Sequence, residues 1–247
     1  MNYEARFGGI GRLYGTRGLD ILRNSRMAVV GIGGVGSWAA EALARSGAGA
    51  IILMDLDDLC VTNTNRQIHA LGTTIGQSKT EAMAARIRDI NPEAEIITLD
   101  NFYTEANAKK LFGTAPDVII DAIDSLSPKA HLIASCYRNK QPLITCGGAG
   151  GRTDPSKIEI ADLSRTKGDP LLSSLRAKLK VQKLARELVE YTGNCTLFVV
   201  PYTKPQEYIR DHAPDVLFTV LMRRSMLRIA NQVAHKLELQ ALITGES

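Results

Sequence analysis

The chain lacks several features that would assign it to a class directly. Its four cysteines are scattered, and no two form a CxxC pair, which argues against a disulfide framework and a four-thiolate zinc site. There is no run of about eighteen apolar residues, the length that a membrane-spanning helix needs. The first residues contain no apolar stretch of the kind that secretory signals carry. We therefore expect a reduced, cytoplasmic enzyme.

An excess of one charge is absent from most of the chain. Residues 1–151 carry 15 basic and 15 acidic side chains, whereas residues 152–247 carry 15 basic and 11 acidic ones. The net charge of +4 therefore comes entirely from the C-terminal part. Such a balance suits a polyanionic partner such as RNA, and it also suits a solvated helix face, so both interpretations stay open.

Short apolar runs alternate with helical patterns over the first 150 residues. The runs predict strands at 27–32, 50–55, 95–99, 118–122 and 143–146. The patterns between them predict helices at 35–45, 78–90, 104–112 and 127–139. This alternation indicates an α/β fold with a doubly wound, mostly parallel, Rossmann-like sheet that helices cover on both faces.

Beyond residue 152 the alternation weakens. We predict a strand at 157–163, a charged amphipathic helix at 170–191, a strand at 196–200 and a final helix at 215–239. Arg223, Arg224 and Arg228 interrupt the last helix, which argues against a bilayer span but leaves contact with a membrane surface undetermined. The predicted organisation is an N-terminal arm (1–26), a main domain (27–165) and an irregular C-terminal extension (166–247) that packs on it.

A glycine-rich turn stands where a nucleotide-binding turn should, after the first strand and at a helix start. It contains Gly31, Gly33, Gly34 and Gly36. Glycines let the backbone approach phosphates, and a helix N-terminus favours negative charge. Asp55 ends the second strand, 19 residues after Gly36, where a carboxylate can hold ribose hydroxyls. These features suit NAD and ATP equally.

The following segment favours a triphosphate. Arg66 and Lys79 would supply positive charge where negative charge grows as pyrophosphate departs. Asp121 and Asp124 end the fourth strand, at the edge where such sheets bind ligands. A carboxylate there can hold a Mg²⁺ that bridges phosphates, and we prefer Asp124 for this role.

Four motifs together resemble the ubiquitin-activating-enzyme-like adenylyltransferases: GIGGVG, MDLDDLCVTNTNRQ, GQSK and DAIDS. The resemblance implies that Asp55 binds ribose, that Asn63, Arg66 and Lys79 contact the phosphates of ATP, and that Asp124 serves Mg²⁺–ATP. Asp57 is also expected to bind the nucleotide. Arg66, Lys79 and Asp124 are the expected catalytic residues.

Within this superfamily the chain resembles the tRNA threonylcarbamoyladenosine dehydratases over residues 6–163. The matching segments are RFGGIGRLYG, TNTNRQIHALG, DAIDSLSPKAHLIASCYRNK and PLITCGGAGG. The resemblance implies a ligase-type enzyme that adenylates a carboxylate on tRNA carrying threonylcarbamoyladenosine, releasing pyrophosphate and then AMP. It also implies a homodimer, in which Arg6 or Arg12 would reach the neighbouring ATP, and a sulfur-transfer protein partner. DNA is not an expected partner.

Other functions remain open at this stage. The first alternative is an enzyme that activates the C-terminus of a ubiquitin-like or sulfur-carrier protein, although the absence of CxxC pairs counts against it. A second alternative is a non-catalytic nucleotide- or RNA-binding adaptor, which the unusual C-terminal third suggests. A dehydrogenase is disfavoured because no acid–base group for a nicotinamide is visible.

Single residues outside these motifs carry expectations as well. Cys136 and Cys146 are expected to be small buried hydrophobes, and Cys195 is the cysteine expected in an exposed setting. Trp38 is expected to pack within the helix layer, and His69 to pack near a helix start or to approach the site.

Overall fold

The computed structural model describes residues 3–192, 203–236 and 238 of the chain. The chain divides into two compact units, residues 1–188 and residues 189–247. The second unit contains the helices α7 (Thr203–His212) and α8 (Asp215–Lys236). Across the described residues, no helix is both long and apolar enough to cross a membrane.

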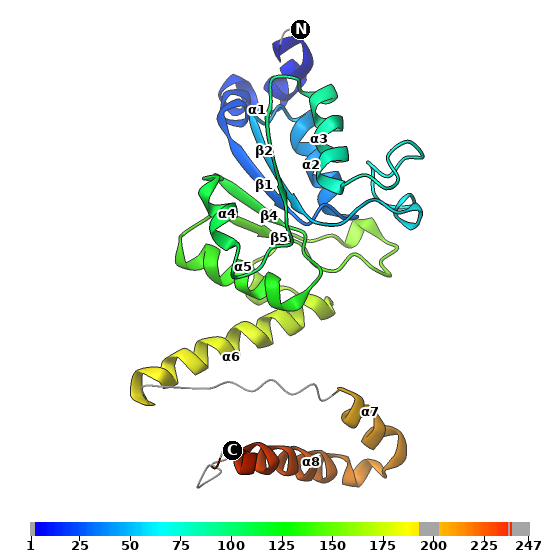
Figure 1. Ribbon diagram of the computed structural model, residues 1–247, viewed down its shortest axis with the longest axis vertical. Coiled ribbons are helices and arrows are strands. Elements are labelled where there is room, and N and C mark those ends of the chain that lie inside the picture. Colours follow the sequence, from blue (N-terminus) through cyan, green and yellow to red (C-terminus); the bar gives the residue numbers. More distant parts are fainter. Residues whose placement is uncertain (1–2, 193–202, 237, 239–247) are drawn as a thin grey trace. The chain divides into compact units, whose positions relative to one another are not determined.

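The first unit is built around a five-stranded parallel sheet (Figure 1). Its strands are β1 (Arg26–Val30), β2 (Ala50–Asp55), β3 (Glu95–Asp100), β4 (Val118–Asp121) and β5 (Leu143–Thr145). The helices that connect them are α2 (Gly36–Arg45), α3 (Lys79–Ile90), α4 (Ala108–Gly113) and α5 (Leu126–Arg138). The strand order is β3-β2-β1-β4-β5, which confirms the predicted doubly wound α/β fold.

Alternate side chains of the central strands fill two cores, one on each face of the sheet. Val29, Ile51 and Leu53 pack with α2 and α3, where Ala40 and Ala44 let the helix approach closely. The other face buries a second set of strand residues against α4 and α5, namely Ala28, Val30, Ile52, Met54 and Ile119. Truncating Ile51, Leu53 or Ile52 to alanine would cost about 2–5 kcal/mol.

The direction of strand addition reverses beside β1. The chain passes from β1 to β2 and β3 on one side, then returns to place β4 and β5 on the other. Val30 is in register with Met54 of β2 and with Asp121 of β4, so three strands end at one edge. A crevice at such a reversal is the usual ligand site of doubly wound sheets.

The N-terminal segment is a helix, α1 (Tyr3–Asn24), which the sequence did not predict. Its five glycines lower helix propensity, and Gly15 (φ 77°, ψ 163°) breaks the helix in the middle. The Tyr3 hydroxyl donates to the carbonyl oxygen of Gly47 at 2.6 Å, and the Phe7 ring packs against the Tyr3 ring in a tilted arrangement, with 4.7 Å between their centroids. Tertiary burial of these two rings therefore holds the segment in place.

The predicted strand at 157–163 is wrong. This stretch instead runs between two single turns, Pro155–Lys157 and Leu163–Arg165, and no strand forms between them. The carboxylates of Asp154 and Asp162 accept hydrogen bonds from the backbone of Ser156 and Ser164, so local turns replace sheet pairing.

The helices differ from prediction mainly at their ends. The helix predicted from 104 begins only at Ala108, because the Asn107 side chain accepts from the Thr104 N–H and forms a turn there. α6 (Pro170–Thr192) and α8 match the predicted helices, whereas α7 was not predicted. The predicted strand at 196–200 lies outside the described residues.

Candidate active site

The glycine turn joins β1 to α2 and is tightly constrained at two positions. Gly31 has φ +89°, and a Cβ there would lie 2.9 Å from the carbonyl oxygen of Ala122. At Gly36 a Cβ would lie 1.7 Å from the carbonyl oxygen of Gly31. Open space surrounds Gly33, and no side chain caps the α2 N-terminus at Val35. The open backbone and the helix N-terminus without a side-chain cap suit an anion such as a phosphate.

Asp55 braces this turn from the end of β2. Its Oδ2 accepts from the Ile32 N–H at 2.6 Å, and its Oδ1 accepts from the Asp57 N–H at 3.0 Å. The residue is 6% exposed. Asp55 therefore fixes the approach of the turn to β2 in addition to the ribose role that its position suggests.

Lys79 opens α3 and lies against the segment that follows β2. Its ammonium group is 2.6 Å from the Asp57 carboxylate, and its backbone N–H donates to the Asp57 carbonyl at 3.0 Å. The Lys79 side chain is 8% exposed and that of Asp57 is 53% exposed. The pair therefore holds a buried cation behind a carboxylate that solvent and ligands can reach.

Asn63 and Arg66 belong to the Arg66 turn, residues 60–67. The Asn63 side chain accepts from the Cys60 N–H at 3.1 Å, so it shapes the turn from inside. The aliphatic stem of Arg66 lies over Gly34, with a distance of 3.3 Å from its Cδ to a Cβ built on that glycine. Its guanidinium donates to the Thr62 carbonyl at 2.9 Å and remains exposed.

The two aspartates at the end of β4 have different surroundings. Asp121 is fully buried, with the Lys129 ammonium 2.9 Å from its Oδ2 and the Ile123 N–H donating to its Oδ1 at 3.0 Å. Burial raises the pKa of Asp121, and the Lys129 charge opposes that shift. Asp124 is exposed, and the Ser125 hydroxyl lies 3.3 Å from its Oδ1. Asp121 therefore orients the strand end, and Asp124 is accessible to a ligand.

Lys129 was not singled out from the sequence. It lies in the first turn of α5, is 0% exposed, and also donates to the Ile123 carbonyl at 2.9 Å. The available signal was weak: a lysine eight residues after a strand-end aspartate, on a helix whose neighbours Ala130 and Leu132 are apolar. Only the packing of α5 on β4 identifies it as the partner of Asp121.

Trp38 and one cysteine differ from prediction. Trp38 is 54% exposed and its indole N–H donates to the Arg66 carbonyl, so it does not pack within the helix layer. Cys60 is exposed, and a hydrogen bond with Thr62 lowers the pKa of its thiol. The sequence had suggested an exposed setting only for Cys195, which lies outside the described residues.

The other cysteines and His69 lie in the interior. Cys136 is buried, and burial raises the pKa of its thiol to about 11. Cys146 is half-buried, and burial raises its pKa as well. His69 is 1% exposed, and neither ring nitrogen has a hydrogen-bond partner within the described part of the chain. Burial, reinforced by Lys79 and Arg86, lowers the pKa of His69 to about 4, which keeps the ring neutral.

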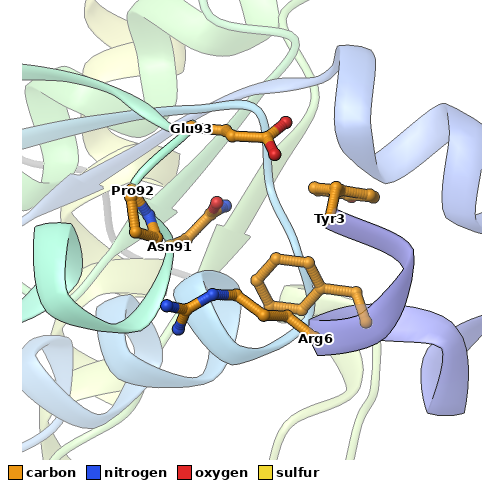
Figure 2. A pocket seen from close by; sticks show the side chains of 6 residues that line it. Tyr3, Arg6, Asn91, Pro92 and Glu93 are labelled. Atoms are coloured by element: carbon orange, nitrogen blue, oxygen red, sulfur yellow. The ribbon is translucent and has the colours of Figure 1, made fainter. Parts of the chain in front are cut away.

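The two N-terminal arginines, Arg6 and Arg12, have different surroundings. The Arg6 guanidinium donates to the carbonyl oxygens of Asp89 and Ile90, at 3.3 and 3.0 Å, at the end of α3. Arg12 is exposed. Arg6 also lines a cavity of about 400 Å³, with Tyr3, Phe7 and residues 91–93, at the opposite, amino edge of the sheet (Figure 2). This cavity is separate from the strand ends that carry the predicted site.

Known proteins with similar sequences support the family resemblance that the motifs indicated. A tRNA threonylcarbamoyladenosine dehydratase of Escherichia coli (strain K12) is 56% identical over 178 residues, covering 72% of this chain and 66% of that protein. The Haemophilus influenzae dehydratase is 54% identical over 179 residues, covering 72% of this chain and 69% of that protein. The chain thus spans about two thirds of the length of the curated relatives that it matches.

A solved structure agrees with the fold. The E. coli tRNA N6-threonylcarbamoyladenosine dehydratase in complex with ATP superposes with a TM-score of 0.72 at 54% identity. The match covers 74% of this chain and 75% of that chain. The resemblance drawn from the motifs is confirmed. The model of the ThiF family matches residues 9–210, which include every residue of the candidate site, and the chain belongs to the ThiF family.

Proposed function

We propose that this chain is an ATP-dependent tRNA threonylcarbamoyladenosine dehydratase, a ligase-type enzyme that activates a carboxylate by adenylation. One observation carries the proposal: the glycine turn, Asp55, Arg66, Lys79 and Asp124 all lie at the carboxyl edge of one sheet. The similarity to dehydratases of two bacteria supports tRNA carrying threonylcarbamoyladenosine as the substrate.

ATP would lie across the point where the sheet reverses. The open backbone at Gly33 and the uncapped α2 N-terminus would receive its phosphates. Asp55 would accept from the ribose hydroxyls through lone pairs that its backbone bonds leave free. Arg66 and Lys79 would stabilise the charge that develops as pyrophosphate leaves, and Asn63 would hold the Arg66 turn in shape.

The residues present fit a Mg²⁺ that arrives with ATP. Among the described residues, no three histidine, cysteine or acidic side chains gather into an all-protein metal site. Mg²⁺ bound to a nucleotide needs only one or two carboxylates, because phosphates and waters complete its shell. The exposed Asp124 provides one such carboxylate. The ion would supply positive charge to the phosphates.

The reaction needs positioning and charge more than a protein nucleophile. An oxygen of the threonylcarbamoyl carboxylate attacks the α-phosphorus, and the bond to pyrophosphate breaks, giving an acyl-adenylate. An atom of the same modified nucleoside then attacks the activated carbonyl carbon and releases AMP, so a ring closes. The nucleoside has lost one water overall. The buried Cys136 and the half-buried Cys146 have no role in these steps.

The remaining parts of the proposal rest on the resemblance. They are a homodimer in which Arg6 or Arg12 reaches the neighbouring ATP, a sulfur-transfer protein partner, and a cytoplasmic location. Of the two arginines, Arg12 suits a partner's nucleotide better, because Arg6 already donates to the end of α3. Residues 27–165 would form the adenylation domain, with residues 1–26 as an arm and 166–247 as an extension that packs on it.

The test is release of AMP and pyrophosphate from Mg²⁺–ATP, with and without tRNA bearing linear threonylcarbamoyladenosine. We expect AMP release that depends on the tRNA, together with loss of one water from the nucleoside by mass spectrometry. Asp124→Asn should slow release by on the order of 100-fold, whereas Asp20→Asn, an exposed carboxylate on α1, should not. ATP binding without turnover or mass change would contradict the proposal.

A further inference from the structure

The Arg66 turn has a defined internal shape. The Asn63 side chain accepts from the Cys60 N–H at 3.1 Å, and the Arg66 N–H donates to the Asn63 carbonyl at 3.1 Å. The guanidinium of Arg66 donates to two groups of the same turn, the Thr62 carbonyl at 2.9 Å and the Asn65 side chain at 3.0 Å. The arginine side chain therefore moves with the turn that carries it.

Burial fixes this turn at only two of its residues, Asn63 and Gln67, which are 7% and 5% exposed. Val61 is 72% exposed, and the stretch from Thr64 to Arg66, which carries the guanidinium, is exposed as well. Two contacts connect the turn to the nucleotide-binding elements. The Arg66 stem lies over Gly34, and the Trp38 indole N–H donates to the Arg66 carbonyl at 2.9 Å. Both partners belong to the glycine turn and to the α2 helix that it opens.

Trp38 is poorly explained by packing. It is 54% exposed, whereas a tryptophan that serves a core buries most of its large apolar surface. Its one polar group is nevertheless satisfied, by a carbonyl 28 residues further along the chain. A hydrogen bond between neutral groups contributes little to folding, but it fixes two segments in one relative orientation.

We infer that Trp38 is a positioning residue: its indole N–H ties the Arg66 turn to α2 and so holds the Arg66 guanidinium over the nucleotide phosphates. This inference rests on the proposed function. Arg66 acts where pyrophosphate leaves, so a small displacement of its turn should slow the reaction more than it weakens ATP binding. Trp38 itself touches no reacting atom in this scheme.

The experiment is a double-mutant cycle on the full-length chain, with ATP and modified tRNA. Trp38→Phe keeps an aromatic ring and removes the N–H. We expect AMP release at saturating ATP to fall by roughly 5- to 10-fold, with the KM for ATP changed by less than about threefold. In an Arg66→Ala background the same change should alter the rate by less than about twofold, because Trp38 acts through Arg66.

Controls separate positioning from folding. Tyr137→Phe alters an aromatic that is 87% exposed on α5, and it should leave the rate unchanged. The midpoint of thermal unfolding of Trp38→Phe should match the wild type. A wild-type rate for Trp38→Phe, or an equal loss in both backgrounds, would overturn the inference.

Failure of the proposed function gives a different pattern. If the wild type binds ATP without turnover, the same four proteins are compared by the calorimetric Kd for ATP. Coupling between Trp38 and Arg66 in those affinities supports the positioning role, and additive losses overturn it. A wild type that binds no ATP overturns the positioning role and the proposed function together.

Discussion

Asp55 and Lys79 are already paired within the protein, whereas Arg66 and Asp124 face solvent. Both Asp55 oxygens accept backbone N–H groups, and the Lys79 ammonium lies 2.6 Å from Asp57. Such preorganised groups keep their geometry before a ligand arrives. The exposed side chains of Arg66 and Asp124 bond to neighbours within their own loops, so their substitution should affect activity more than stability.

The neutral, buried His69 leads to a prediction about pH. Its pKa is about 4 in the folded protein, below the ordinary 6.5 of an unfolded chain. The unfolded chain therefore binds the proton more tightly, and the stability that depends on a neutral ring is complete above pH 6.5 and is lost as the pH falls toward 4. The free energy of unfolding should drop by about 2 kcal/mol between pH 7 and pH 5 from this group alone.

His69→Leu isolates this contribution. The variant keeps an apolar side chain in the same interior position and cannot be protonated. Urea unfolding at pH 7 and pH 5 should show a smaller drop for His69→Leu than for the wild type, by about the same 2 kcal/mol. Equal drops for the two proteins would show that His69 is not held neutral.

At the scale of elements, the glycine turn and the β4–α5 connection decide where the site forms. The turn lets β1 pass into α2 beside Ala122, and the buried Asp121–Lys129 pair joins the end of β4 to the first turn of α5. Both connections lie at the same strand ends, so a change in either should alter nucleotide binding.

Substitution by alanine should affect stability at one glycine of the turn and ATP affinity at another. Gly36→Ala places a methyl group 1.7 Å from the Gly31 carbonyl oxygen, and we expect it to destabilise the fold by roughly 3 kcal/mol. Gly33→Ala meets open space, so its stability should stay within about 1 kcal/mol of the wild type. ATP affinity of Gly33→Ala should nevertheless fall roughly tenfold, because the methyl group stands where phosphates approach.

Chemical denaturation and calorimetry with ATP measure these two effects separately. A stable Gly36→Ala protein would mean that the turn is looser than this geometry, and unchanged ATP affinity of Gly33→Ala would place the nucleotide elsewhere.

Removing one partner of the Asp121–Lys129 pair should destabilise the fold. Lys129→Met leaves a buried carboxylate without its partner, and we expect a loss of about 3–5 kcal/mol in the free energy of unfolding. Adding Asp121→Asn removes the isolated charge and should recover most of that loss. Urea unfolding of the two variants checks this, and a double variant no more stable than Lys129→Met would contradict the ion-pair interpretation.

At the scale of the whole molecule, every residue of the candidate site belongs to the unit of residues 1–188. The family match reaches residue 210, and the α/β cores lie on either face of the sheet in the first unit. The basic excess of residues 152–247 lies in sequence beyond every residue of the candidate site.

Shortening the chain tests that division. A chain that ends at Thr192, the last residue of α6, should keep its Kd for ATP within about threefold, because no site residue and no member of the two main cores is removed. Calorimetry with ATP gives this comparison, and far-ultraviolet circular dichroism checks that the fragment is folded. Loss of ATP binding by a folded fragment would show that the C-terminal residues contribute to the site.

The sequence alone predicted the α/β fold because the glycine turn and the buried strands are encoded locally, by residue type and spacing. The strand-end positions of Asp55, Asp121 and Asp124 followed from the same pattern, since parallel strands carry their ligands at the carboxyl edge. Motif resemblance identified the family. Helix α1 escaped prediction because its glycines oppose a helix, and tertiary contacts stabilise it, among them the burial of Tyr3 and Phe7 against Gly47.

Contacts between distant segments were decided by the tertiary structure. Lys129 meets Asp121, and Trp38 meets Arg66, only after the helices have packed on the sheet. The predicted strand at 157–163 failed for a related reason: strand formation needs a partner, and local turns at Asp154 and Asp162 formed where none was available. Residue spacing encodes periodicity and turns, whereas the pairing of two side chains depends on how whole elements pack, which no local pattern specifies.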